Sequence, residues 1–107
     1  MDHYKVLVTG ATGFLGNAVC HNLQDDDRYT LIPLAGRKEW DLTRQGYMAT
    51  ALTELQPDVV IHLAATVGGI GANKENPGLF MYNNLVMGLN VIEECRDYGK
   101  LKKFIMV

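Results

Sequence analysis

The sequence predicts an α/β fold in which helices cover both faces of a parallel, doubly wound sheet. Short apolar runs alternate with stretches of helical periodicity, in the order strand, helix, strand, helix, strand, helix, strand. A glycine-rich turn joins the first strand to the first helix, which is typical of doubly wound sheets. The chain has 107 residues, 48% of them hydrophobic, which is enough for one small globular domain.

The first part of the chain contributes two predicted strands and one helix. Residues 5–9, "KVLVT", form a short apolar run that stops at a glycine, as a buried strand does. Residues 13–24 have helical spacing of apolar side chains, and residues 29–34, "YTLIPL", are the second strand. Pro33 has no N–H to donate, so we expect the paired part of this strand to end near Ile32.

A second helix and a third strand follow. Asp41 or Thr43 is a candidate N-cap for a helix that runs to about Leu55. Residues 58–65, "DVVIHLAA", are almost continuously apolar and are bounded by Pro57, so they predict a buried strand. A loop of glycines and polar residues comes next.

A long helix and a fourth strand complete the pattern. The helix is predicted over residues 78–98, and Gly99 is suited to end it. Its apolar stripe contains Leu85, Leu89 and Ile92. The fourth strand is "KKFIMV", residues 102–107. Right-handed crossovers favour the strand order 3-2-1-4, so the predicted fold class is a Rossmann-like doubly wound sheet.

The turn after the first strand has the pattern of a phosphate-binding loop. In "TGATGFLG", three glycines have the spacing T-G-x-x-G-x-x-G. The first permits a tight turn, the second lets a pyrophosphate approach the backbone, and the third lets the helix pack on the strand. Free amides and the dipole of the helix then favour phosphate. The alternative is a plain strand–helix turn. The candidate cofactor-binding residues here are Gly10, Thr12, Gly13, Phe14, Leu15 and Gly16.

Residues after the second strand favour NADP over NAD. NAD-binding sheets usually carry an acidic residue near this point, whereas Arg37 and Lys38 come first here. The Arg37 guanidinium can pair with a 2′-phosphate through two hydrogen bonds; alternatively it is a solvated loop charge. Asp41 and Leu42 are candidates for the edge of the adenine site, and Asp41 has capping as its other role.

Composition and charge limit the other possibilities. The net charge of −2 offers no basic surface for nucleic acid, and no apolar run approaches the ~20 residues of a membrane span. Cys20 and Cys95 have no metal-ligand spacing, so we expect buried free thiols, no metal and a reducing, cytoplasmic compartment. His62 is expected to be a hydrogen-bonded core residue rather than a base.

Several segments together resemble the extended short-chain dehydrogenase/reductase superfamily. They are "VLVTGATGFLG", "DLT", "QPDVVIHLAA" and "VGGIGAN". The pattern "AAxVGGIxAN" is similar to the GDP-L-fucose synthase branch, also called the GDP-4-keto-6-deoxymannose epimerase/reductases. It comprises Ala64, Ala65, Val67, Gly68, Gly69, Ile70, Ala72 and Asn73. "DLTRQ" with Asn84 and Asn90 also matches, and the resemblance covers the N-terminal third of such an enzyme.

The resemblance implies roles for the turn after the third strand and the second glycine-rich loop. Leu63, Ala64, Ala65 and Val67 would border the adenosine half of NADP. Gly68, Gly69 and Asn73 would face the cleft where cofactor and GDP-sugar meet. Ligands of open α/β sheets do sit outside the carboxyl ends of the strands. The residues alone leave a flexible glycine connector as the alternative.

The resemblance also implies an activity. A homodimeric enzyme would use NADPH to convert GDP-4-keto-6-deoxy-D-mannose into GDP-L-fucose, by epimerisation at two carbons and reduction of the ketone. Its catalytic serine would follow Val107, and its Tyr-x-x-x-Lys pair would come later. We therefore expect residues 1–107 to be the N-terminal part of an NAD(P)-binding domain, to contain no catalytic residue, and to be inactive alone.

Three features depart from this pattern or compete with it. Thr12 stands where some relatives have a basic residue, and "NLVMG" replaces the common "NVxGT". Tyr98 and Lys102 match Tyr-x-x-x-Lys, but Gly99 is expected to end the helix between them. There are two alternative functions. The chain is part of another nucleotide-sugar epimerase or dehydratase, or it is a non-catalytic NAD(P)-binding regulatory module.

Overall fold

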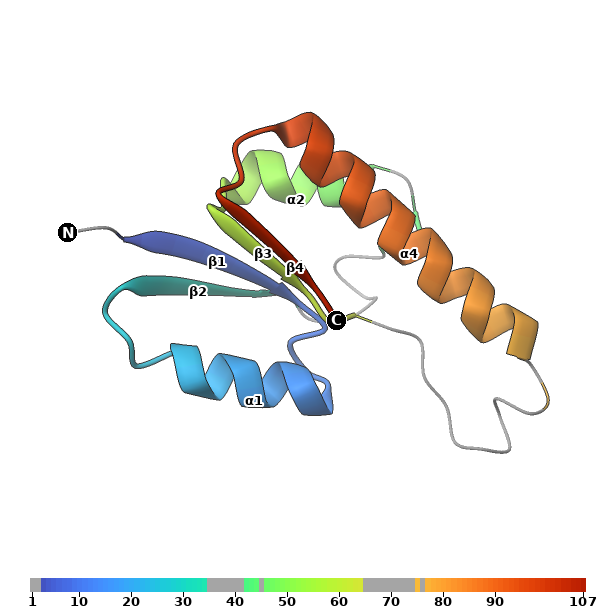
Figure 1. The fold of residues 1–107 in the computed structure, drawn as a ribbon, viewed down its shortest axis with the longest axis horizontal. Coiled ribbons are helices and arrows are strands. Elements are labelled where there is room, and N and C mark those ends of the chain that lie inside the picture. Colours follow the sequence, from blue (N-terminus) through green and yellow to red (C-terminus); the bar gives the residue numbers. More distant parts are fainter. Residues whose placement is uncertain (1–2, 35–41, 45, 65–74, 76) are drawn as a thin grey trace.

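A computed structural model describes residues 3–34, 42–44, 46–64, 75 and 77–107. Four parallel strands form one sheet, as the fold class predicted (Figure 1). The strands are β1 (Tyr4–Thr9), β2 (Tyr29–Leu34), β3 (Val59–His62) and β4 (Lys103–Met106). The helices are α1 (Phe14–Leu23), α2 (Tyr47–Leu55) and α4 (Pro77–Tyr98).

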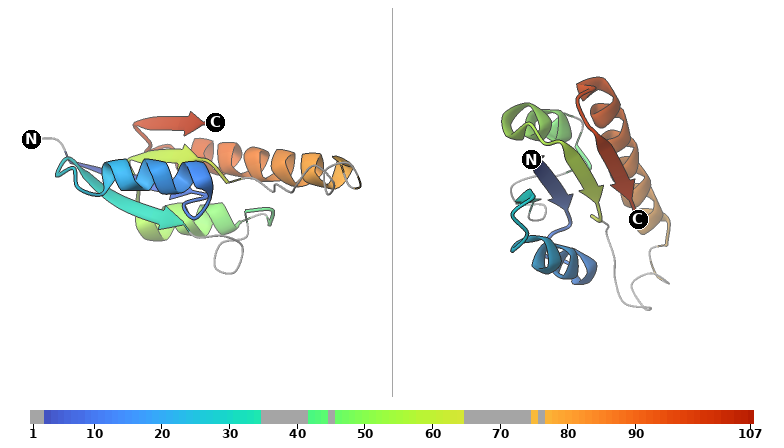
Figure 2. Two further views of the ribbon diagram at one scale, coloured as in Figure 1. Left: turned by 90° about the horizontal axis from the view of Figure 1, so that it is seen from below. Right: turned by 60° about the vertical axis from the view of Figure 1, so that its left-hand side comes forward.

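The helices form a layer on each side of the sheet. α1 lies on one face, and α2 and α4 lie side by side on the other (Figures 1 and 2). The main core fills the space between the sheet and the second layer, because apolar side chains from both meet there. Its largest fully buried members include Leu7, Met48, Leu52, Val60 and Val91.

The predicted strand order 3-2-1-4 is wrong: the observed order is β2-β1-β3-β4. The carbonyl of Arg28 accepts the N–H of Tyr4, and the carbonyl of Leu34 accepts the N–H of Ala11. Backbone groups alternate in direction along a strand, so Pro33 faces away from β1. A strand paired with the outer side of β2 would find no N–H donor at Pro33. β1 contains no proline, so every residue on its other side has an N–H to offer β3.

The pairing of β2 also extends beyond the predicted end at Ile32. Pro33 lies opposite Val8, and Leu34 lies opposite Thr9. The proline does not stop the ladder, because the position of its missing N–H faces the outer edge. Among the described residues, β2 is thus an edge strand that tolerates proline.

The helix ends agree with the prediction at α4 and differ at α2. α4 ends at Tyr98, and Gly99 has a φ of 69° with its N–H 3.2 Å from the carbonyl oxygen of Cys95, as predicted. α2 begins only at Tyr47, after Gly46, so neither Asp41 nor Thr43 is its N-cap.

The stripe predicted for α4 is not the one that packs in the core. Leu85, Leu89 and Ile92 are 59%, 65% and 46% exposed. The buried stripe consists of Met87, Val91 and Cys95. The helix therefore has two apolar stripes, and only one of them faces the sheet.

Candidate dinucleotide-binding site

The candidate site lies where β1 and β3 end at the same edge of the sheet (Figure 1). Gly10 follows β1 with a φ of 69°, a conformation that favours glycine. A Cβ added at Gly10 would lie 2.7 Å from the backbone nitrogen of Ala64. The first glycine loop is thus in backbone contact with the turn after β3, and no side chain fits between them.

Gly16 has the packing role that the sequence predicted. A Cβ at Gly16 would lie 1.9 Å from the carbonyl oxygen of Gly10, so any side chain there collides with backbone. Gly16 is also the one buried residue of α1. This close approach sets the direction in which α1 leaves the loop.

Gly13 has a different environment. Its φ is −76° and its ψ is 176°, an extended conformation that any residue adopts. A Cβ there would meet only the carbonyl oxygen of Gly10, at 3.4 Å, which is ordinary contact. The described chain therefore does not require glycine at this position. The space beside Gly13 is open, as close approach of a phosphate would need.

The amino end of α1 is suited to an anion. Gly13 precedes the helix and has no side chain to cap it, and the first turn contains no acidic residue. The N–H of Asn17 donates to the carbonyl of Gly13 at 2.8 Å, so the amides of Phe14, Leu15 and Gly16 precede this bond and point out of the helix end. Together with the helix dipole, these amides favour a phosphate group.

The other described candidate residues near this helix end differ in how exposed they are. Phe14 is 96% exposed and Leu15 is 44% exposed. Thr12 is exposed, and its carbonyl accepts a hydrogen bond from the Asn17 side chain at 3.3 Å. Leu63 and Ala64 are half-buried in the turn after β3.

Leu42 is in the hydrophobic core rather than open to the loop, with 5% of its surface exposed. Its carbonyl accepts a hydrogen bond from the Asn90 side chain of α4 at 3.0 Å. Asn90 therefore fixes the segment that precedes α2. The remaining candidates lie outside the described residues: Arg37, Asp41, Ala65, Val67, Gly68, Gly69 and Asn73.

Thr9 is a buried residue of this region that sequence reasoning did not single out. Its hydroxyl oxygen accepts the N–H groups of Leu63 and Ala64, at 3.0 and 3.1 Å. The same oxygen lies 2.7 Å from His62 Nδ1. His62 is 4% exposed, and burial lowers its pKa, so it is the hydrogen-bonded core residue that the sequence predicted.

Tyr98 and Lys102 contact different parts of the sheet. The Tyr98 hydroxyl donates to the carbonyl of Pro57 at 3.0 Å, at the opposite end of β3 from the glycine loop. The Lys102 ammonium lies 5.0 Å from the centre of the Tyr4 ring. Burial raises the pKa of Tyr98, whereas a catalytic acid or base needs a pKa near the working pH.

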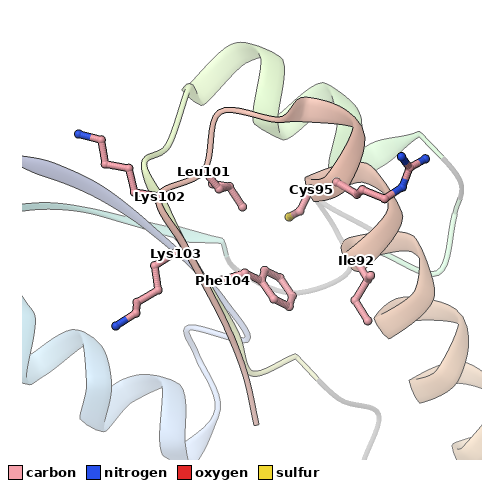
Figure 3. Close-up of a pocket in the computed structure, with 7 residues that line it drawn as sticks. Ile92, Cys95, Leu101, Lys102, Lys103 and Phe104 are labelled. Atoms are coloured by element: carbon pink, nitrogen blue, oxygen red, sulfur yellow. The ribbon is translucent and has the colours of Figure 1, made fainter.

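A hollow of about 330 Å³ lies near the amino end of β4, also far from the glycine loop (Figure 3). Leu101, Phe104 and the Cys95 thiol point into it, Ile92 lines it, and Lys102 and Lys103 point away. The hollow is lined mainly by apolar atoms and is open to solvent on one side. The hollow offers no convergent polar groups, so it is not the candidate site.

Both cysteines lie in described helices, Cys20 in α1 and Cys95 in α4. Cys95 is buried, as predicted, but Cys20 is only half-buried, and both thiols are free. No cluster of three potential metal ligands occurs among the described residues. Within the same residues, no helix has the length and apolar character needed to cross a membrane.

Comparison with known proteins identifies the family of the chain. The profile of the NAD dependent epimerase/dehydratase family matches residues 6–107. The chain is 40% identical to a GDP-L-fucose synthase of Sinorhizobium fredii, over 87% of this chain and 29% of that protein. It is 36% identical to a GDP-L-colitose synthase of Yersinia pseudotuberculosis, over 87% and 30%. The chain thus spans about 30% of the length of these curated relatives.

Solved structures of enzymes that act on GDP-sugars are also similar to this chain. A GDP-L-fucose synthetase from Naegleria fowleri bound to NADP has a TM-score of 0.78 and 32% identity, covering 99% of this chain and 31% of its own. MlghC, a GDP-mannoheptose C4 reductase from Campylobacter jejuni with NADP bound, has a TM-score of 0.86 and 29% identity, covering 99% and 31%. With this fold, this loop and a profile that matches almost the whole sequence, the chain belongs to the NAD dependent epimerase/dehydratase family.

Proposed function

We propose that this chain is the cofactor-binding part of an enzyme that uses NADPH to convert GDP-4-keto-6-deoxy-D-mannose into GDP-L-fucose. The observation that carries the proposal is the open space at Gly13, beside the uncapped amino end of α1. The GDP-L-fucose synthases among the relatives and the motif "AAxVGGIxAN" support the choice of reaction.

The residues of the glycine loop fit a dinucleotide pyrophosphate. Gly13 leaves room for it, the first amides of α1 donate to it, and Gly16 holds the helix at the required angle. When bound, NADPH supplies the hydride that reduces the ketone. The exposed Phe14 side chain stands beside the loop, where it can exclude water from the bound cofactor.

The choice of NADP rests on Arg37. No acidic residue follows β2 directly, because Arg37 and Lys38 precede Glu39 in the sequence, and the Arg37 guanidinium can bind a 2′-phosphate through two hydrogen bonds. Structural relatives solved with NADP bound support this choice.

The substrate would lie beyond the carboxyl ends of the strands. There the glycines of the "VGGI" loop would allow close approach of the substrate to the backbone, and the Asn73 amide would donate and accept hydrogen bonds to the GDP-sugar. We assign no residue of this chain to proton transfer. The group that protonates the ketone oxygen would come from another part of the enzyme.

We further propose that the complete enzyme is a cytoplasmic homodimer. The exposed apolar stripe of α4, which contains Leu85, Leu89 and Ile92, gives a second copy a surface to cover. The free thiols of Cys20 and Cys95 fit a reducing compartment.

The test is a product assay on the full-length protein. GDP-4-keto-6-deoxy-D-mannose and NADPH are supplied, NADPH absorbance is followed, and the sugar product is identified by NMR. GDP-L-fucose as the product supports the proposal. A reduced product with both neighbouring carbons unchanged would make the enzyme a reductase of this sugar without epimerase activity, and would contradict the proposed reaction. Absence of NADPH consumption, with NADPH still bound, would favour the non-catalytic module.

A further inference from the structure

Thr9 and His62 form a buried pair at the ends of β1 and β3. The two residues lie opposite each other in the register of the sheet. Thr9 is fully buried, and His62 is almost so. Their side chains are joined by the hydrogen bond between Thr9 Oγ1 and His62 Nδ1, at 2.7 Å.

The hydrogen bonds around Thr9 fix the direction of this contact. A hydroxyl has one hydrogen and two acceptor lone pairs. The N–H groups of Leu63 and Ala64 occupy both lone pairs of Thr9 Oγ1. The hydroxyl hydrogen is left for His62 Nδ1, which must accept it. The neutral imidazole therefore carries its own proton on Nε2.

Burial favours the same form of the ring. It lowers the pKa of His62, because a charged imidazolium is poorly solvated in the core. A protonated ring would carry a hydrogen on Nδ1 and direct it at Thr9 Oγ1. Both lone pairs of that oxygen already accept backbone N–H groups, so it could not accept this hydrogen as well. Geometry and solvation thus agree on a neutral ring that acts as acceptor.

The Thr9 hydroxyl connects this ring to the glycine loop. Thr9 immediately precedes Gly10, and Ala64 packs against Gly10 with no room for a side chain. The two bonds to the hydroxyl, together with the bond from the Leu63 N–H to the Thr9 carbonyl oxygen at 3.3 Å, hold the turn after β3 against the start of the loop. If the acceptor at His62 were lost, the hydroxyl could rotate and one of these bonds would weaken.

We propose that His62 is a positioning residue for the dinucleotide: it orients the Thr9 hydroxyl, which holds the turn at Leu63 and Ala64 against the phosphate loop. The inference rests on the proposed function, because it assumes that this loop binds NADPH. His62 itself transfers no proton.

The first test measures NADPH binding by calorimetry in the full-length protein. His62→Leu and Thr9→Val each remove one side of the contact, and each should weaken binding about tenfold, the equivalent of one hydrogen bond. His62→Asn, whose side-chain oxygen can replace Nδ1, and Thr9→Ser should bind as the wild type does. The double variant should also lose about tenfold, because the two residues act as one unit.

Binding that is unchanged in a folded His62→Leu variant would overturn the proposal. The proposal would also be overturned if the loss of NADPH affinity in the double variant equalled the product of the losses in the two single variants. A purely stabilising role would lower the thermal unfolding temperature of His62→Leu and leave its NADPH affinity unchanged.

The second test does not depend on NADPH. Nitrogen NMR of the imidazole rings should assign to His62 the Nε2–H form, identified by the signal that disappears in His62→Asn. In Thr9→Val this signal should move towards a mixture of both neutral forms. An Nδ1–H or charged ring at neutral pH in the wild type contradicts the proposal. If the wild type does not bind NADPH, the proposed function fails, and the ring signal still decides whether His62 orients Thr9.

Discussion

The Gly13→Val variant of the full-length protein should lose NADPH binding and keep its fold. Gly13 has an extended backbone, and a Cβ there meets one carbonyl oxygen at ordinary contact distance. Valine at the position before a helix costs about 1 kcal/mol of folding free energy, which is partly offset because the unfolded chain loses freedom. The added methyl groups would occupy the space that the pyrophosphate needs.

The expected loss of affinity follows from the amides at the start of α1. Hydrogen bonds to a charged group contribute about 1.5–3 kcal/mol each, so the loss of two costs about 3–6 kcal/mol. That weakens binding at least about 100-fold. Calorimetric titration with NADPH measures this change, and circular dichroism with thermal unfolding measures the fold.

Gly16→Ala is the matched control, because it adds less volume at a neighbouring glycine. Its Cβ would collide with the Gly10 carbonyl oxygen, so it should destabilise the protein by about 1–3 kcal/mol or more. Gly13→Val should therefore unfold at a higher temperature than Gly16→Ala. Unchanged NADPH affinity in Gly13→Val, or equal stability losses in the two variants, would refute the roles assigned to these glycines.

Three other predictions concern residues outside the glycine loop. Arg37→Ala should weaken NADPH binding by about 1–3 kcal/mol and leave NADH binding unchanged; an equal loss for both cofactors, measured by calorimetry, would mean that Arg37 does not bind the 2′-phosphate. Tyr98→Phe should retain turnover and lose about 0.5–1.5 kcal/mol of stability, because only the hydrogen bond to Pro57 is removed; inactivation of the stable variant would place catalysis in this chain after all. Burial raises the pKa of the Cys95 thiol to about 11, so at mildly alkaline pH it remains protonated, and mass spectrometry should find it alkylated more slowly than Cys20 in the native protein. Faster alkylation of Cys95 would show that α4 opens.

The sequence predicted the elements well because each depends on local chemistry. Apolar runs that end at glycine define β1, and Gly99 ends α4 in the conformation that glycine favours. The spacing of the glycines predicted the loop, and at Gly10 and Gly16 an added Cβ would collide with backbone atoms. These features need no knowledge of distant contacts.

Features that depend on tertiary contacts were missed. The pattern of elements did not reveal whether the third strand pairs with β2 or with β1, and Pro33, interpreted only as the end of a strand, was the residue that disfavours pairing with β2. The apolar periodicity of α4 contains two stripes, and nothing local distinguishes the buried one. Thr9 and His62 meet through the register of β1 and β3, so their contact follows from the pairing rather than from either segment.

The outward direction of Pro33 also affects how the sheet can meet other chains. The open side of an edge strand is a template for foreign strands, which can pair with its free N–H and C=O groups. On the outer side of β2, the proline interrupts this template with a missing donor and a bulky ring, close to the end of the strand. An intruding strand would lose one ladder bond there. We therefore expect this edge to protect the protein against edge-to-edge aggregation, and Pro33→Val to aggregate faster while it stays folded.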